Sequence, residues 1–166
     1  MTAQIMDQIS LNGKVYEIQC EPDIPVPHDM ITLLETPIDD TVITHSSACW
    51  RRYLAHWAVN DGYLYLSNIE GIYEKKCQEP IRADWFSGEI CAIDGELLDY
   101  VHLGYASTYE FEHKLRFENG QLVDQQLIDN RGKTNFDPEP TEEAAQAFKV
   151  LLDEMIAGLN KDLKKR

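Results

Sequence analysis

The sequence lacks most of the features that mark a chemical activity. Its four cysteines are widely spaced, form no CxxC pair, and have no histidine at the spacing of a zinc site. No stretch approaches the roughly 18 apolar residues of a membrane-spanning helix. Residues 1–10 contain neither a basic nor an apolar signal region. We therefore expect a cytoplasmic protein with reduced thiols, no metal, no cofactor and no membrane association.

Positive charge is also scarce. The chain has 15 Lys and Arg against 29 Asp and Glu, which gives a formal net charge of −14. Such a charge repels nucleic acid and anionic membranes, so neither is expected as a partner. It would instead steer a basic protein toward the surface. The simpler alternative is that the acidity only keeps the protein in solution.

What the sequence does contain is a set of turn signals. Asn-Gly and Asp-Gly dipeptides tolerate the positive φ angles of type I′ turns, which join neighbouring antiparallel strands. Several of them separate short apolar segments, and this predicts a meandering antiparallel sheet. They are Asn12-Gly13, Asp61-Gly62, Asp94-Gly95 and Asn119-Gly120.

Two segments show what such a sheet looks like in this chain. Residues Tyr109 to Glu118 alternate strictly between apolar or aromatic side chains and charged ones, which is typical of a strand with one buried and one wet face. Residues Tyr53 to Val59 are apolar on both faces, so we expect a central strand there. The predicted fold class is α+β, with a meandering antiparallel sheet that is strongly curved or partly barrel-like.

The α component is predicted at the C-terminus. Residues 130–140 are polar and end in Asp-Pro-Glu-Pro, which indicates a connector between the sheet (1–129) and a helix (141–166) of one domain. Thr141 is a suitable N-cap, and two glutamates follow it where the helix dipole favours anions. An apolar stripe predicts that this amphipathic helix packs on the sheet. The stripe comprises Ala144, Phe148, Leu151, Leu152, Met155, Leu159 and Leu163.

Candidate binding residues come from loops that place aromatic side chains beside acids. Aromatic side chains with one polar end are enriched at binding surfaces. The ordinary alternative is that these aromatics pack a small core beneath long loops. If a partner binds, we expect it to contact Glu70, Glu74, Asp84, Trp85, Glu96, Asp99 and Tyr100.

One segment invites a catalytic interpretation. His45 and Cys49 could form a nucleophile and base, and Arg51 and Arg52 could lower the thiol pKa. However, groups this close in an extended sequence seldom face each other, and geometry decides such a pair. We therefore assign no catalytic residues and expect a protein that is not an enzyme.

Three runs carry a resemblance to known proteins. Leu64–Gly71, Ala83–Gly88 and Tyr100–Tyr105 resemble a family of small bacterial proteins that has no assigned activity, over a span from Trp50 to Glu118. This resemblance implies no mechanism. In overall type (small, acidic, cytosolic, with a β-sheet, a helix and no evident site) the chain is similar to immunity proteins that neutralise bacterial toxins.

The leading hypothesis is therefore an acidic protein-binding domain that neutralises a cognate bacterial toxin by occluding its active site. The partner would be a basic toxin domain encoded nearby. One alternative is a small-ligand-binding β domain with an aromatic-lined pocket. A further alternative is an enzyme that uses Cys49 or a histidine–carboxylate pair.

Overall fold

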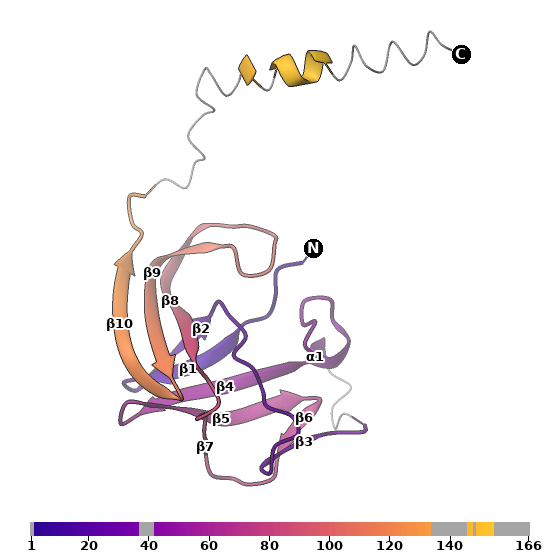
Figure 1. Cartoon of the computed structure of the whole chain (residues 1–166), viewed down its shortest axis with the longest axis vertical. Helices are drawn as coiled ribbons and strands as arrows, with labels where there is room; N and C mark the ends of the chain where they lie inside the picture. Colours follow the sequence, from indigo (N-terminus) through magenta and orange to yellow (C-terminus); the bar gives the residue numbers. More distant parts are fainter. Residues whose placement is uncertain (1, 37–41, 134–145, 148, 155–166) are drawn as a thin grey trace, which may run out of the picture. The chain divides into compact units, whose positions relative to one another are not determined.

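The computed structural model describes residues 2–36, 42–133, 146–147 and 149–154, and contacts divide the chain into two units, Met1–Gly132 and Lys133–Arg166. The first unit is mostly antiparallel β-sheet (Figure 1). Its elements, in chain order, are β1 (Asp7–Leu11), β2 (Lys14–Ile18), β3 (Ile31–Leu33), α1 (Val42–His45), β4 (Tyr53–Asn60), β5 (Tyr63–Gly71), β6 (Tyr73–Lys75), β7 (Ile81–Arg82), β8 (Gly88–Asp99), β9 (Thr108–Glu118) and β10 (Gln121–Asp129).

Three of the predicted turns are confirmed. Asn12-Gly13 joins β1 to β2, Asp61-Gly62 joins β4 to β5, and Asn119-Gly120 joins β9 to β10. Both residues of each turn have positive φ, for example 48° at Asn119 and 77° at Gly120, as a type I′ turn requires. Local turn chemistry therefore sets the register of these hairpins.

The fourth predicted turn is wrong. Asp94 and Gly95 lie inside β8, where the register against β9 shifts between Asp94 and Leu97, so they form a bulge and the strand continues to Asp99. Gly95 has a φ of +81°, and the side chain of Glu110 on β9 occupies the place that a Cβ would need. The bulge thus needs glycine for two independent reasons.

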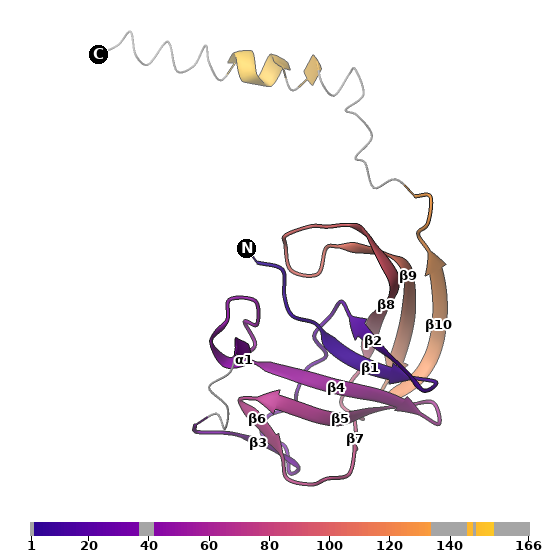
Figure 2. The ribbon, with the colours of Figure 1, turned by 180° about the vertical axis from the view of Figure 1, so that it is seen from behind.

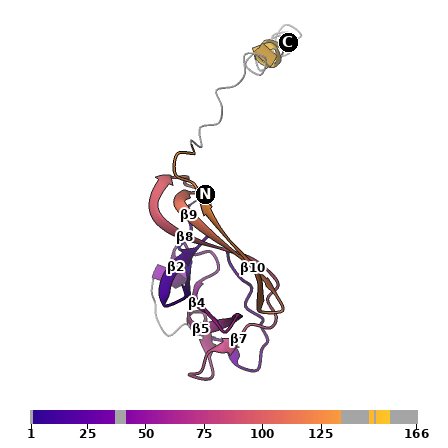
Figure 3. The same ribbon diagram turned by 90° about the vertical axis from the view of Figure 1, so that its left-hand side faces the viewer.

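The sheet closes on itself at one end. Its order is β10-β9-β8-β2-β1-β4-β5-β7, and β10 also pairs with β5 at Gln121 and Tyr63. Seven of the described strands therefore form a ring, and β7 lies outside the ring, paired with β5. Two backbone bonds secure the closure: Leu64 N donates to Gly120 O and Leu122 N donates to Gly62 O, each at 2.8 Å. The 90° turned view shows β10 on the wall opposite β2 and β4 (Figure 3).

One neighbouring pair of strands corrects the purely antiparallel expectation. β1 and β4 run parallel, with Ile9 opposite Trp57, and Figure 2 shows them side by side. A parallel pair needs a crossover connection. Residues 19–52, which contain β3 and α1, provide it, because they carry the chain from β2 past β1 before β4 begins. β4 then lies between β1 and β5, which confirms its predicted central position.

The core fills the inside of the ring. Trp57 and Phe117 are its largest fully buried side chains, and aliphatic side chains from the other strands surround them. In β4, Tyr53, Ala55 and Trp57 are buried while the residues between them are half-buried, as the two-residue period of a strand demands. The remaining buried aliphatic residues include Ile9, Ile18, Leu64, Leu66, Ile90 and Leu115.

The second unit contains the described part of the predicted C-terminal helix. Residues 146–147 and 149–154 are helical, and Leu151 and Leu152 are exposed within that unit. The N-cap Thr141 and the stripe residues Ala144, Phe148, Met155, Leu159 and Leu163 lie outside the described residues. The predicted packing of the helix on the sheet stays a prediction. Among the residues that the structure describes, no helix is long and apolar enough to cross a membrane.

Candidate functional site

The predicted binding residues fall into three places on the first unit. Glu70 on β5 and Glu74 on β6 line one cleft, Asp84 and Trp85 follow β7, and the third group lies on β8 or just beyond it. Figure 1 shows the far end of the β8–β9 hairpin at the opposite end of the unit from β3, β6 and β7. The seven residues therefore do not form one patch. The third group consists of Glu96, Asp99 and Tyr100.

Trp85 has a packing role. Its ring contacts the core cluster and lies 5.3 Å from the ring of His28, and its Nε1 donates to the Asp23 carbonyl oxygen at 2.9 Å. Asp84 pairs with Arg82 at 2.6 Å on the exposed surface. Trp85 is half-buried and helps to hold the proline-containing loop after β2 against the sheet.

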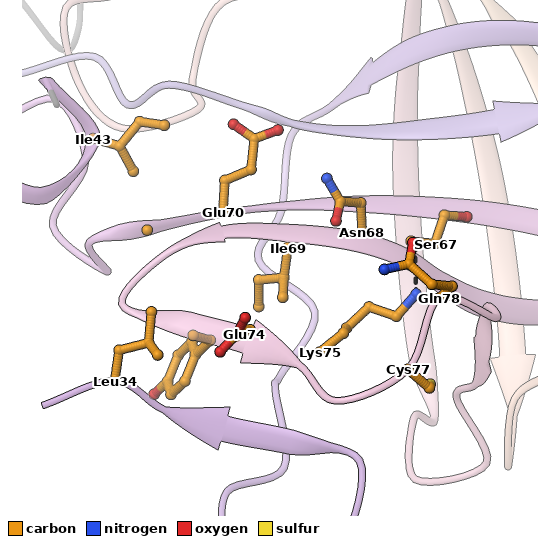
Figure 4. Close-up of a pocket in the computed structure, with 12 residues that line it drawn as sticks. Leu34, Ile43, Ser67, Asn68, Ile69, Glu70, Glu74, Lys75, Cys77 and Gln78 are labelled. Carbon is orange, nitrogen blue, oxygen red and sulfur yellow. Dashed lines mark hydrogen bonds between the residues drawn. The ribbon is translucent and has the colours of Figure 1, made fainter. Parts of the chain in front are cut away.

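The cleft has a volume of about 540 Å³ and lies where β5 ends and β6 begins (Figure 4). The two-stranded β3–β6 sheet frames it, with Ile31 opposite Lys75 and Leu33 opposite Tyr73. Tyr73 and Ile69 supply apolar surface. Most of the other side chains are polar, including Ser67, Asn68, Glu70, Glu74, Lys75 and Gln78.

Two polar contacts organise the cleft. The Glu70 carboxylate lies 3.0 Å from Nε2 of His56 on the neighbouring strand β4, and Lys75 Nζ donates to the Ser67 carbonyl oxygen at 2.6 Å. Figure 4 shows the carboxylates of Glu70 and Glu74 apart, not facing each other. The pair therefore lacks the geometry in which two carboxylates share one reacting atom, but each can accept hydrogen bonds from a cationic or hydroxylated group.

A different surface forms at the open end of the ring. We name it the tip surface and define it by Trp50, Glu96, Leu97, Leu98, Asp99, Tyr100 and Leu103. Trp50 is 55% exposed and Tyr100 is 58% exposed, which is unusual for aromatic side chains. Gln4 joins the two loops that carry them, because its N–H donates to Gly104 O at 3.1 Å and its Oε1 accepts from Trp50 N at 3.0 Å.

A buried ion pair holds these loops in place. Arg51 donates to Asp7 Oδ1 at 2.6 Å and to the hydroxyl of Tyr105 at 2.6 Å, and Tyr105 in turn donates to Glu21 at 2.7 Å. The Asp7 side chain is fully buried, and Arg51 is almost so. Trp50 is the residue beside Arg51, and Tyr105 closes the loop that follows β8. The network therefore connects both halves of the tip surface to β1.

The charges in this network perturb one another. Burial raises the pKa of Asp7, although the Arg51 guanidinium and the Ala55 N–H oppose that rise. Burial alone would lower the pKa of Arg51, but the carboxylates and Tyr105 hold it above its ordinary value. A sequence signal for the network exists: Asp7, Ile9 and Leu11 alternate toward the same inward face of β1. An acid on an apolar face requires a buried cation.

The catalytic alternative meets an unfavourable environment at Cys49. The thiol is buried, and its Sγ donates to the Tyr53 carbonyl oxygen at 3.3 Å. Burial raises its pKa and outweighs the attraction of Arg51. A nucleophilic cysteine needs the opposite shift, together with exposure. All four cysteines are free thiols, and burial likewise raises the pKa of Cys20 to about 12 and that of Cys91 to about 11.

Comparison with known proteins does not identify the chain. The sequence matches no family model, and comparison with curated proteins and with solved structures gives no match. The resemblance to small bacterial proteins and to immunity proteins therefore stays a prediction.

Proposed function

We propose that this protein is an acidic protein-binding domain that neutralises a cognate bacterial toxin by occluding the toxin's active site. The observation that carries the proposal is the tip surface, where Trp50 and Tyr100 are each more than half exposed and where Glu96 and Asp99 of β8 are exposed as well. Exposed apolar side chains rimmed by charge are typical of protein interfaces. In this proposal the tryptophan that anchors the partner is Trp50, whereas the sequence had suggested Trp85.

The two aromatics would supply most of the affinity. Tryptophan and tyrosine are enriched among the few interface residues whose truncation costs more than about 2 kcal/mol, because they bury a large area with few rotatable bonds. The buried Arg51 network fixes the loops on which they lie. The anchors are therefore held in place before the partner arrives, which reduces the entropy cost of association.

The acidic residues would raise the association rate and select for a basic partner. The first unit contains 22 of the 29 acidic residues and 9 of the 15 basic residues, so nearly all of the net negative charge belongs to the sheet. A field of this sign accelerates the approach of a basic protein and repels acidic ones. This charge favours a basic toxin domain as the partner.

The test needs the product of the neighbouring gene, co-expressed and purified with this chain, with association and dissociation measured at two ionic strengths. Trp50→Ala and Tyr100→Ala should each speed dissociation by about 30-fold, which corresponds to about 2 kcal/mol. Asp99→Lys should slow association and weaken its salt dependence. An inhibition assay of the neighbour's activity completes the test, because occlusion requires loss of that activity at one-to-one stoichiometry.

Matched controls lie elsewhere on the same unit. Val15→Ala removes an exposed apolar side chain from β2, and Asp61→Lys makes the same charge change as Asp99→Lys at the turn between β4 and β5. Val15→Ala should leave dissociation unchanged, and Asp61→Lys should slow association less than Asp99→Lys does. If the neighbour is neither toxic nor bound, the immunity role fails. If it binds equally fast at low and high salt, the electrostatic mechanism fails.

A second candidate function rests on the cleft between β5 and β6. The sequence suggested an aromatic-lined pocket for a small ligand. The lining of this cleft is instead mostly polar, although the aromatic residue Tyr73 belongs to it. A ligand there would be a cation or a polyol that bonds Glu70 and Glu74. Screening polyamines and sugars by thermal shift, with Glu74→Gln as the control, would reveal it.

A further inference from the structure

Among the described residues, no strand pairs with the outer edge of β10 for most of its length. β10 meets β5 only at the turn end, through Gln121 and the bond from Leu122 N to Gly62 O. β7 then takes over that edge of β5, with Arg82 opposite Tyr65. From residue 123 to residue 128, the pairing of β10 within the described residues is with β9 alone.

The register shows which backbone groups point outward. In an antiparallel pair, residues alternate between those bonded to the neighbouring strand and those that face away from it. Asn130 N donates to Glu110 O at 2.8 Å, which fixes the phase of this alternation at the end of the strand. Counting back along the register, residues 124, 126 and 128 face β9. Gln125 and Leu127 therefore turn their N–H and C=O groups to the outside, and both are exposed.

This edge lacks the usual protection. Natural sheets block exposed edges with proline, lysine or a covering element. Residues 123–128 contain no proline, glycine or lysine, and Leu127 is 59% exposed. The charged residue of this stretch is Asp124, and Asp129, which follows it, is paired with Arg131 at 2.7 Å. Within the part of the chain that the structure describes, the edge is thus available for pairing, and Asp124 gives it a negative charge.

The charge indicates what would pair with it. A second copy of the chain would bring another acidic sheet against the first, and five or six residues of edge would bury too little area to offset that repulsion. An extended cationic segment meets no such repulsion, and Asp124 together with the net negative charge of the first unit attracts it. Main-chain bonds would then provide affinity, and lysine or arginine side chains would provide selectivity.

We propose that the edge of β10 from Val123 to Ile128 binds an extended, cationic segment of a partner protein as an added strand. The proposal deepens the proposed function and rests on its partner being a basic protein. It assigns the partner a second contact, made by backbone atoms, in addition to the aromatic anchors of the tip surface. It also predicts that the bound segment is unstructured or at an edge before binding.

A synthetic probe tests this without the natural partner. A fluorescent heptapeptide of alternating lysine and valine is titrated into the full chain and followed by anisotropy. The control peptide alternates lysine and proline, so it has the same charge but cannot continue a ladder. The lysine–valine peptide should bind at least about tenfold more tightly, a difference of about 1.4 kcal/mol.

Variants of Leu127 locate the contact. Leu127→Pro removes the outward N–H without removing a bond to β9, and it should reduce binding of the lysine–valine peptide about tenfold. Leu127→Thr keeps the N–H and should bind normally. Because the proline variant could fail to fold, amide exchange in the unchanged protein gives an independent measurement: the amides of Gln125 and Leu127 should slow when the peptide is added.

The outcomes separate the two proposals. If both peptides bind equally and neither amide slows, attraction is by charge alone and the added strand is overturned. If the chain forms a dimer that Leu127→Pro dissociates, a second copy occupies the edge and the cationic occupant is overturned. If the lysine–valine peptide slows both amides while the neighbouring gene product does not bind, the edge proposal stands and the immunity role fails.

Discussion

The inward-facing residues of β9 are buried to different degrees at the two ends of the ring. Near the Asn119-Gly120 turn, Leu115 and Phe117 of β9 are each about 1% exposed, because β5 and β10 close the ring there. Toward the other end, Tyr109 and Phe111 are half-buried, although they continue the same inward face. The difference shows that alternation identifies a face, whereas burial depends on which other strand covers it.

The contrast suggests that the closed end of the ring stabilises the fold and that the open end binds the partner. The closed end holds the core and the closing backbone bonds. The open end carries the exposed aromatics of the tip surface and the free edge of β10. Substitutions at the closed end should therefore change the free energy of unfolding, and substitutions at the open end should change binding with little effect on unfolding.

The largest effect is expected at Trp57. Its ring is fully buried, and Trp57→Ala should cost about 3–5 kcal/mol because it removes apolar contacts and leaves a cavity. Tyr100→Ala at the tip surface should change the free energy of unfolding by less than about 0.5 kcal/mol. Urea denaturation of both variants measures the contrast. A tip variant as damaging as the core variant would show that the open end is part of the core.

The ion pair beneath the tip surface comes next. Arg51→Met should cost about 3 kcal/mol at pH 7, because it leaves the buried Asp7 carboxylate without its cation. Burial raises the folded-state pKa of Asp7 and Arg51 opposes that rise, so the variant has the higher Asp7 pKa and gains more stability from protonation of Asp7 than the unchanged protein does. The loss caused by Arg51→Met should therefore shrink as the pH falls toward 4. An equal loss at both pH values would mean that the charge of Asp7 does not cause the loss.

A smaller effect on stability is expected from alanine substitutions at two glycines that occupy equivalent turns. Gly62 and Gly120 both have a φ of +77°, so alanine costs each the same backbone strain. A Cβ on Gly62 would meet open space, whereas one on Gly120 would lie 2.6 Å from the Ala83 carbonyl oxygen. Gly120→Ala should be the more destabilising by about 1–3 kcal/mol in thermal or urea unfolding. Equal effects would contradict the tight closure at this end.

The smallest effect concerns an exposed pair, Lys14 and Asp94, 2.8 Å apart. The hydrogen bond between them lowers the pKa of Asp94 and raises that of Lys14. The stabilisation is therefore present at neutral pH, is lost as the pH falls through the Asp94 pKa, and is lost again as the pH rises through the Lys14 pKa. Lys14→Met should differ from the unchanged protein only between these limits, and high salt should reduce the difference.

The sequence predicted the local features of the fold and missed those that depend on distant pairing. Asn12-Gly13 forms the expected turn because both flanking strands are short and alternate. Asp94-Gly95 has the same chemistry but becomes a bulge, because Leu97 and Asp99 continue to pair with β9. The parallel contact of β1 with β4 spans more than forty residues, and no local pattern encodes it.

The residues of the candidate sites also fall into those that local sequence could identify and those that it could not. Tyr100 was identified because an aromatic in a polar loop is locally conspicuous. Trp50 was not, because its exposure and its place beside the Gly104 loop depend on Gln4, which bonds both loops from the N-terminal segment. Glu70 and Glu74 meet in one cleft because β3 pairs with β6 from about forty residues away.

Hydrogen exchange of the free protein tests the central comparison most directly. The amides of Leu64 and Leu122, which close the ring, should exchange only through global unfolding, and their protection should fall in parallel with stability in Gly120→Ala. The outward amides of Gln125 and Leu127 should exchange at nearly the rate of an unfolded chain. If Leu127 is protected as strongly as Leu64, the edge is already covered, and the division into a closed and an open end is wrong.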